Sequence, residues 1–167
     1  MSARPVSLAD LFTAPQYNPE QNVRPSLVRT AMQNKNFPRN TRRVLYIEDH
    51  EDTRELVTLV LEQKSFEVVT GATIASGVAL AASEQFDLYL LDSWLPDGSG
   101  LDLCKQIRKF DNATPILFYS AAAYEIDRDQ ALKSGAQAYL VKPTHPSELC
   151  TVVESLVESH RRVRAAS

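Results

Sequence analysis

The sequence predicts a doubly wound α/β fold built on a parallel sheet. From residue 43 onward, short apolar runs of β type alternate with stretches whose apolar residues recur at helical spacing. The apolar runs are nearly continuous, which is typical of strands buried on both faces. With right-handed crossovers, the five strand–helix pairs in residues 43–160 give a three-layer (βα)5 sandwich.

Five runs are expected to be strands because they are rich in Val, Ile, Leu, Phe and Tyr and are bounded by polar or turn residues. In chain order, these runs are residues 43–47, 66–70, 86–91, 115–119 and 136–141.

A helix is expected after each strand. Asp52 and Glu55 have the spacing of a capping box, and Ser99 begins the third helix. Gly135 is typical of the residue that follows a helix, and Pro146 suits a first turn. The expected helices are residues 52–63, 74–85, 99–110, 123–134 and 147–160.

Composition divides the 167-residue chain into three parts. Residues 1–41 hold five of the nine prolines and show no strong period, so an irregular N-terminal extension is expected. Residues 42–160 form one domain, and residues 161–167 form a basic C-terminal tail. The extension is basic and the domain is acidic. Neither the extension nor the C-terminal tail has enough basic residues close together to predict direct nucleic-acid binding.

The sequence also predicts a cytoplasmic protein that contacts no membrane. No apolar run approaches the roughly 20 residues of a membrane helix, and the N-terminus leads into no signal-type apolar region. Cys104 and Cys150 match no metal-ligand spacing and are expected to be reduced thiols.

Charged and polar residues follow four of the predicted strands. Glu48 and Asp49 follow the first strand, Asp92 the third, Ser120 the fourth and Lys142 the fifth. Ligands of such sheets bind beyond the carboxyl ends of the strands. We therefore expect these side chains to meet at one edge.

Three carboxylates at one edge need positive charge nearby. Two unit charges about 4 Å apart repel by roughly 4 kcal/mol at an effective dielectric constant near 20. Lys142 could neutralise one carboxylate, and oxygen ligands favour a hard divalent cation such as Mg²⁺ (or Mn²⁺) for the others. His50 follows the acidic pair and is expected to point away from it.

A magnesium ion on carboxylates is usually completed by phosphate oxygens, which suggests phosphoryl chemistry. Asp92 would be the nucleophile, Lys142 would stabilise the transferring group, and Ser120 would donate to a phosphoryl oxygen. Taken singly, these residues also suit a turn acid, a surface lysine and a turn hydroxyl. Their combination at the ends of separate strands favours a site.

Residues 43–160 resemble the receiver domain of bacterial two-component response regulators. The resemblance is carried by the segments 44–49, 92–98, 119–121 and 142–143. It implies a flavodoxin-like fold with strand order 2-1-3-4-5. It also implies a phosphoacceptor signalling domain, not an enzyme, that assists only its own phosphorylation and dephosphorylation.

The resemblance further implies that Asp92 receives its phosphoryl group from a histidine kinase or a histidine phosphotransfer protein. Glu48 and Asp49 would hold the Mg²⁺, with Asp49 and Asp92 as the expected direct ligands and the Trp94 backbone carbonyl as another. The Lys142–Pro143 peptide is expected to be cis.

A switch is implied as well. On phosphorylation, Ser120 would move toward the phosphate, Tyr139 would enter the vacated space, and the surface of the fourth helix, fifth strand and fifth helix would change partners. Trp94 is bulky, and Ala122 offers no acid or amide to position water, so slow spontaneous dephosphorylation is expected. Trp94 could instead merely pack on the surface.

Output is expected through an unidentified protein partner, bound by that surface or by residues 1–41, and homodimerisation is left open. The alternatives are a phosphorylation-independent adaptor and a fragment lacking its DNA-binding domain. A haloacid-dehalogenase-like phosphatase is disfavoured, because such enzymes usually carry a second Asp where this chain has Trp94.

Overall fold

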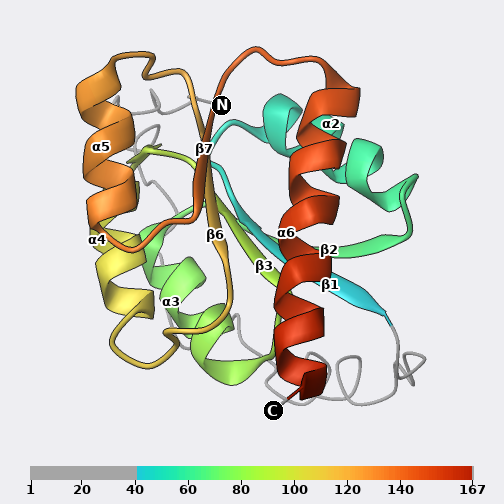
Figure 1. Cartoon of the computed structure of the whole chain (residues 1–167). Coiled ribbons are helices and arrows are strands. Elements are labelled where there is room, and N and C mark those ends of the chain that lie inside the picture. The colour runs from blue at the N-terminus through green and yellow to red at the C-terminus, as the bar shows by residue number, and fades with distance from the viewer. Residues whose placement is uncertain (1–40, 167) are drawn as a thin grey trace, which may run out of the picture. The chain divides into compact units, whose positions relative to one another are not determined.

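A computed structural model describes residues 41–166, which form a five-stranded parallel sheet between two layers of helices (Figure 1). The expected extension lies outside the described residues except for Thr41. The strand order β2-β1-β3-β6-β7 confirms the predicted 2-1-3-4-5 order. From one edge to the other, the strands are β2 (Phe66–Gly71), β1 (Arg42–Ile47), β3 (Leu88–Leu91), β6 (Ile116–Ser120) and β7 (Ala138–Val141).

The helices divide between the two faces of the sheet. Helices α2 and α6 pack on one face, and α3, α4 and α5 on the other (Figure 1). Their bounds are α2 (Glu51–Glu62), α3 (Ile74–Ser83), α4 (Gly100–Ile107), α5 (Glu125–Lys133) and α6 (Pro146–Ala166).

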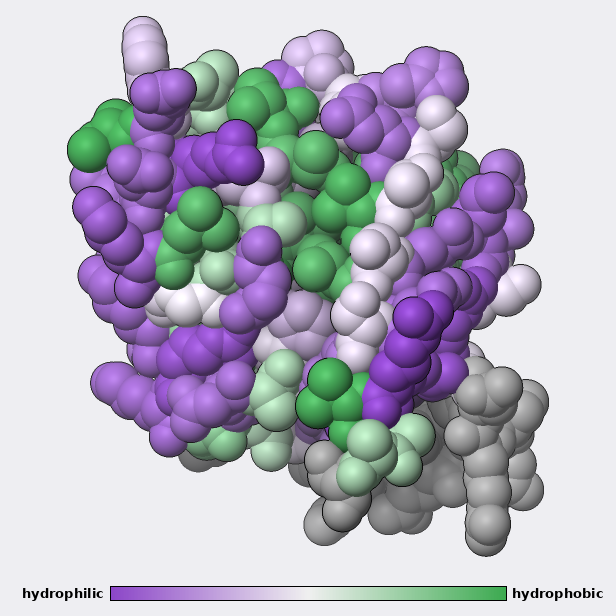
Figure 2. All heavy atoms as spheres, viewed as in Figure 1, coloured by the Kyte–Doolittle hydropathy of each residue, from purple (hydrophilic) through white to green (hydrophobic). Residues whose placement is uncertain are grey.

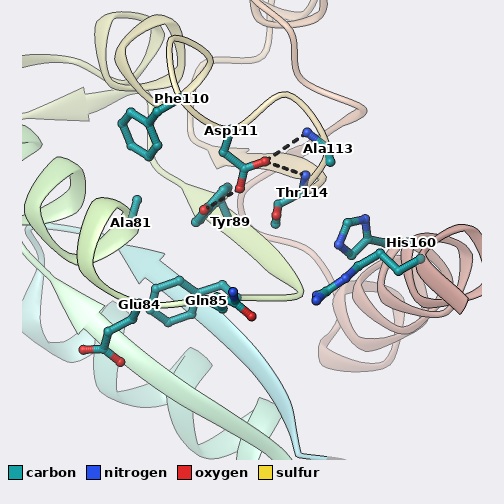
Figure 3. A pocket seen from close by; sticks show the side chains of 11 residues that line it. Ala81, Glu84, Gln85, Tyr89, Phe110, Asp111, Ala113, Thr114 and His160 are labelled. Atoms are coloured by element: carbon teal, nitrogen blue, oxygen red, sulfur yellow. Dashed lines mark hydrogen bonds between the residues drawn. The ribbon is translucent and has the colours of Figure 1, made fainter. Parts of the chain in front are cut away.

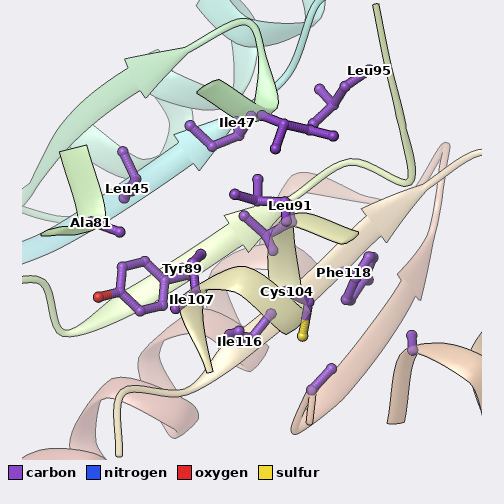
Figure 4. Packing of buried hydrophobic residues seen from close by; sticks show 14 of the residues in the cluster. Leu45, Ile47, Ala81, Tyr89, Leu91, Leu95, Cys104, Ile107, Ile116 and Phe118 are labelled. Carbon is purple, nitrogen blue, oxygen red and sulfur yellow. The ribbon is translucent and has the colours of Figure 1, made fainter. Parts of the chain in front are cut away.

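Each inner strand contributes side chains to both layers, because successive residues of a strand point to opposite faces. In β1, Val44 and Tyr46 join the cluster beneath α2 and α6, whereas Leu45 and Ile47 join the cluster beneath α3, α4 and α5. Figure 4 shows the second cluster. Burial on both faces explains the continuous apolar runs.

The start of helix α2 differs from expectation. Helix α2 begins at Glu51 with His50 as its N-cap, so the capping box predicted at Asp52 is wrong. The chain enters this helix almost directly from β1, which places Asp52 inside the first turn. A capping box does occur at α3, where the Thr73 and Ser76 side chains satisfy each other's backbone N–H groups.

A short antiparallel hairpin, β4 (Trp94–Leu95) and β5 (Gly98–Ser99), follows β3 and was not expected as strands. Gly98 has φ +143°, a conformation that favours glycine. A Cβ on Gly100 would lie 2.0 Å from the Asp92 carbonyl oxygen, so only glycine lets α4 begin this close to the end of β3. The hairpin therefore turns the chain tightly around Asp92.

Helix α6 continues to Ala166, through most of the segment expected to be a basic tail. The Arg161 guanidinium explains the extension: its Nε lies 2.9 Å from Asp87 Oδ1, and its Nη2 donates to the Thr41 carbonyl over 2.7 Å. These bonds attach the last turns of α6 to the starts of β3 and β1. Within residues 41–166, no helix combines the length and apolarity needed to cross a membrane.

The turn between α4 and β6 is held by Asp111 (Figure 3). Its Oδ1 accepts the backbone N–H groups of Ala113 and Thr114, each over 2.9 Å, and its Oδ2 accepts the Tyr89 hydroxyl over 2.8 Å. Burial alone would raise the Asp111 pKa, but these hydrogen bonds outweigh it and lower the pKa to about 2.

This lowered pKa predicts an acid-sensitive contribution to stability. The ionised Asp111 stabilises the fold above the ordinary carboxyl pKa of 3.8, and this contribution is lost as pH falls toward about 2. The difference in free energy of unfolding between the wild type and Asp111→Asn should be largest near neutral pH and shrink across that window. Denaturant titrations at several pH values measure it, with the exposed Asp129→Asn as control. A difference independent of pH would contradict the assignment.

Candidate functional site

The carboxyl ends of β1, β3 and β7 border a cleft of about 390 Å³. The residues predicted at the strand ends do meet here: its walls include Glu48, Asp49, Asp92, Trp94 and Lys142. Ser120 is the exception, because its side chain is fully buried and the neighbouring Ala121 lines the cleft instead.

Lys142 joins two of the three carboxylates. Its ammonium makes an ion pair with Glu48 Oε2 and lies 3.2 Å from Asp92 Oδ1. The same nitrogen lies 5.2 Å from the centroid of the Tyr119 ring, on the intervening strand β6. The Lys142–Pro143 peptide is cis, as expected. A single ammonium therefore pairs with two of the three carboxylates, and negative charge remains in excess.

Glu48 is the most deeply buried of the three acids, with 1% of its surface exposed. Besides Lys142, its Oε2 accepts the Tyr46 hydroxyl over 2.9 Å, and its Oε1 accepts the His50 backbone N–H over 3.2 Å. Burial and the charge of Glu48 raise the pKa of Tyr46, so its hydroxyl remains a proton donor. Both oxygens of this buried carboxylate thus accept hydrogen bonds from the protein.

The imidazole of His50 lies beside the acidic pair, so the expectation that it points away is wrong. Its Nδ1 is 3.0 Å from Asp49 Oδ1 and 3.5 Å from Glu48 Oε1. The chain turns into α2 at this residue, which brings the ring back over the pair. Arg54 fixes the turn by donating to the backbone carbonyls of Glu48 and Asp49, over 2.8 and 3.3 Å.

The donor set suits a hard divalent cation. Asp49 is one-third exposed, and Asp92 lies at the base of the cleft, where its backbone N–H bonds to the Ile47 carbonyl over 2.9 Å. Among the described residues, Glu48, Asp49 and His50 offer ligand atoms within 4.8 Å of one another. Carboxylate oxygens of this kind, next to open solvent, fit Mg²⁺ or Mn²⁺ with its own waters.

Ser120 and Tyr139 meet at the backbone of one residue, Ala122. The Ser120 Oγ accepts the Ala122 N–H over 3.2 Å, and the Tyr139 hydroxyl donates to the Ala122 carbonyl over 2.7 Å. The Tyr139 ring also stacks on Phe118, with centroids 6.1 Å apart. A shift of Ser120 would therefore disturb the loop that holds Tyr139.

Sequence reasoning missed Tyr46 because it lies within an apolar run. Its spacing was informative: Tyr46 and Glu48 are two residues apart in one extended segment, so their side chains share a face. Arg54 was missed for another reason. Its side chain bonds to backbone carbonyls, which every residue carries, so no residue pattern points to the contact.

Known proteins resemble this chain over the same region. Residues 44–154 match the family model described as the response regulator receiver domain. The phosphate regulon transcriptional regulatory protein PhoB of Escherichia coli is 35% identical over 118 residues, which cover 70% of this chain and 52% of PhoB. A probable transcriptional regulatory protein of Picosynechococcus is 34% identical over 130 residues, 74% of this chain and 52% of that protein.

Solved structures of receiver domains also resemble this chain. A CheY-like receiver domain protein from Methanospirillum hungatei gives a TM-score of 0.70 at 26% identity, covering 73% of this chain and 98% of its own. The non-phosphorylated HemR receiver domain from Leptospira biflexa gives a TM-score of 0.66 at 34% identity, and the match covers 70% of this chain and 94% of the HemR chain. The chain spans about half the length of the curated relatives it matches.

The ion pairs of Lys142 predict a specific loss of stability. Lys142→Met leaves Glu48 and Asp92 without their ammonium, and removal of one partner of a buried pair costs about 3 kcal/mol or more in free energy of unfolding. Excess Mg²⁺ should restore part of this loss by supplying positive charge. Chemical denaturation with and without Mg²⁺ measures both effects.

Lys105→Met is the matched control, because Lys105 forms an exposed pair with Asp102 at 3.7 Å. If both lysine variants unfold alike, Lys142 does not hold the cluster together.

Proposed function

Because this chain belongs to the response regulator receiver family of two-component systems, we propose that Asp92 accepts a phosphoryl group from a phosphohistidine. The donor would be a sensor histidine kinase or a histidine phosphotransfer protein. The observation that carries the proposal is the position of Asp92: it lies in an open cleft, 3.2 Å from the Lys142 ammonium. Asp49, a second carboxylate that lines the same cleft, is one-third exposed to solvent.

The chemistry is a direct transfer. A carboxylate oxygen of Asp92 forms a bond to phosphorus while the phosphorus–nitrogen bond of the donor breaks, and the electron pair leaves with the imidazole. Lys142 offers an ammonium to the phosphoryl oxygens as their charge is redistributed. Asp49, Asp92 and the Trp94 backbone carbonyl would hold Mg²⁺ or Mn²⁺, which supplies further charge neutralisation when bound.

The signal would leave the site through Ser120 and Tyr139. A phosphoryl group brings roughly 1.5–2 negative charges and strong acceptor oxygens, and the buried Ser120 hydroxyl, next to the cleft-lining Ala121, is a donor that could turn toward it. When Ser120 turns toward the phosphoryl group, its bond to the Ala122 N–H is lost and the loop under Tyr139 is released to move. The population of an existing alternative state would then increase.

The face formed by α5, β7 and α6 is the proposed output surface. Figure 2 shows hydrophobic residues between the charged helices α5 and α6, over β7. In β7 and α6, Val141 is exposed, and Leu140, Val152 and Leu156 are partly buried. Such a surface suits a protein partner or a second copy of the chain.

A second candidate function follows from the length of the relatives. Those reported above are transcriptional regulatory proteins, and this chain covers about half of each. The chain could therefore be the receiver part of a transcriptional regulator. A phosphorylation-independent adaptor fits less well, because a protein that only binds partners has no use for repelling carboxylates around Asp92.

The single tryptophan gives a direct test of phosphorylation. Trp94 lines the cleft with 69% of its surface exposed, so a bound ion or phosphoryl group should change its fluorescence. We expect one change on adding Mg²⁺ and a second on adding acetyl phosphate or beryllofluoride. The second should be absent in Asp92→Asn. A flat response to both acetyl phosphate and beryllofluoride in the wild type would favour the adaptor.

The lifetime of the aspartyl phosphate tests the roles of Trp94 and Ala122. We expect loss over minutes or longer, since neither side chain can position an attacking water. Ala122→Gln adds an amide at that place and should speed the release of phosphate by roughly tenfold or more. The exposed Ala123→Gln is the control. A wild-type lifetime of seconds would contradict the expectation.

A further inference from the structure

The hydroxyl of Tyr46 is a polar group placed beneath the site, inside the hydrophobic layer under α2 and α6. Tyr46 is fully buried, and its hydroxyl donates to Glu48 Oε2 over 2.9 Å. The same oxygen accepts the Lys142 ammonium. Both side-chain donors thus hold one oxygen, which leaves Oε1 beside His50, on the side where Glu48, Asp49 and His50 bring ligand atoms together.

This arrangement fixes the rotation of the Glu48 carboxylate. If Lys142 were its only side-chain donor, the Glu48 carboxylate could rotate with the ammonium as the flexible lysine side chain moved. The Tyr46 ring is immobilised by the core, so its hydroxyl is a stationary donor. Because Lys142 also contacts Asp92 at 3.2 Å, the position of its ammonium depends on where Glu48 is held.

We propose that Tyr46 is a positioning residue of this site: its hydroxyl holds Glu48 so that Lys142 stays beside Asp92 and Oε1 stays turned toward the cation-binding side of the cleft. The part that concerns Asp92 rests on the proposed phosphoacceptor function. The part that concerns the cation does not, because it can be measured by Mg²⁺ binding alone.

The chain contains a matched control for this hydroxyl. Tyr89, on the adjacent strand β3, is also buried, and its hydroxyl donates to a carboxylate, Asp111 Oδ2, over 2.8 Å (Figure 3). Its partner lies in the α4–β6 turn, which borders the other end of the sheet. Tyr89→Phe and Tyr46→Phe therefore remove the same kind of hydrogen bond, one away from the cleft and one beneath it.

The experiment compares these variants by thermal unfolding and by Trp94 fluorescence during titration with Mg²⁺ and then with beryllofluoride. Both phenylalanine variants should unfold at a lower temperature. Only Tyr46→Phe should weaken the apparent affinity for Mg²⁺ and for beryllofluoride, by roughly tenfold, the effect typical of a lost hydrogen bond to a charged group. In a Glu48→Gln background, Tyr46→Phe should have little further effect on either affinity.

Equal Mg²⁺ and beryllofluoride affinities for Tyr46→Phe and the wild type would overturn the proposal and leave the hydroxyl with a purely stabilising role. An undiminished effect in the Glu48→Gln background would overturn it too, because Tyr46 would then not act through Glu48. If the wild type binds Mg²⁺ but ignores beryllofluoride, the phosphoacceptor function fails while the Mg²⁺ titrations still test Tyr46.

A measurement on the unaltered protein covers the case in which Tyr46→Phe does not fold. A buried hydroxyl proton bonded to a carboxylate exchanges slowly and can be observed by NMR. The Tyr46 hydroxyl proton should shift when Mg²⁺ is added, whereas that of Tyr89 should not. Identical behaviour of the two protons would contradict the proposal.

Discussion

The excess of negative charge at the carboxyl edge of the sheet is the constraint on which the site depends. Three carboxylates are brought together there with one ammonium, and like charges at such distances repel by several kcal/mol at the effective dielectric of a protein surface, of order 20. Lys142 reduces this repulsion by reaching from the end of β7, over the Tyr119 ring, to Asp92 and Glu48. One side chain thereby connects strands β7, β6, β3 and β1, whose order in the sheet makes the contact possible.

The strands and the residues at their ends could be predicted from sequence because each rests on a local pattern, whereas the order of the strands was implied by the resemblance to receiver domains. Continuous apolar runs mark strands buried on both faces, and parallel strands bring their carboxyl ends to one edge. The features that differed depend on contacts between distant residues. Helix α6 extends because Arg161 meets Asp87, 74 residues away in sequence. The Asp97 carboxylate, beside the unexpected hairpin, accepts the N–H groups of Ile74 and Ala75 at the start of α3.

Within the site, sequence identified the charged groups but not what holds them. The charged groups follow strand ends, at Glu48, Asp49, Asp92 and Lys142. Tyr46 instead lies within the apolar run 44–47, where a tyrosine reads as a core residue. The position of the His50 ring depended on the start of α2, which the capping-box pattern had placed too late. Ser120 and Tyr139 were both named, yet their common contact with the Ala122 backbone has no sequence signature, because any residue supplies those atoms.

The two ends of the sheet differ in how completely their charges are satisfied, and this difference would set the direction in which the proposed phosphoryl group on Asp92 acts. Near the other end, Asp87 is matched by Arg161, and Asp111 by backbone N–H groups and Tyr89. At the carboxyl end, Glu48 is already bound by Tyr46, His50 and Lys142, so it has little freedom to respond to added charge. Ser120 is different, because its Oγ accepts a single long bond within the described residues, 3.2 Å from the Ala122 N–H, and a phosphoryl oxygen could replace this contact with a stronger, charge-assisted one. Movement should therefore start at Ser120 and travel through Ala122 to Tyr139, toward α5, β7 and α6, while the side under α2 stays fixed.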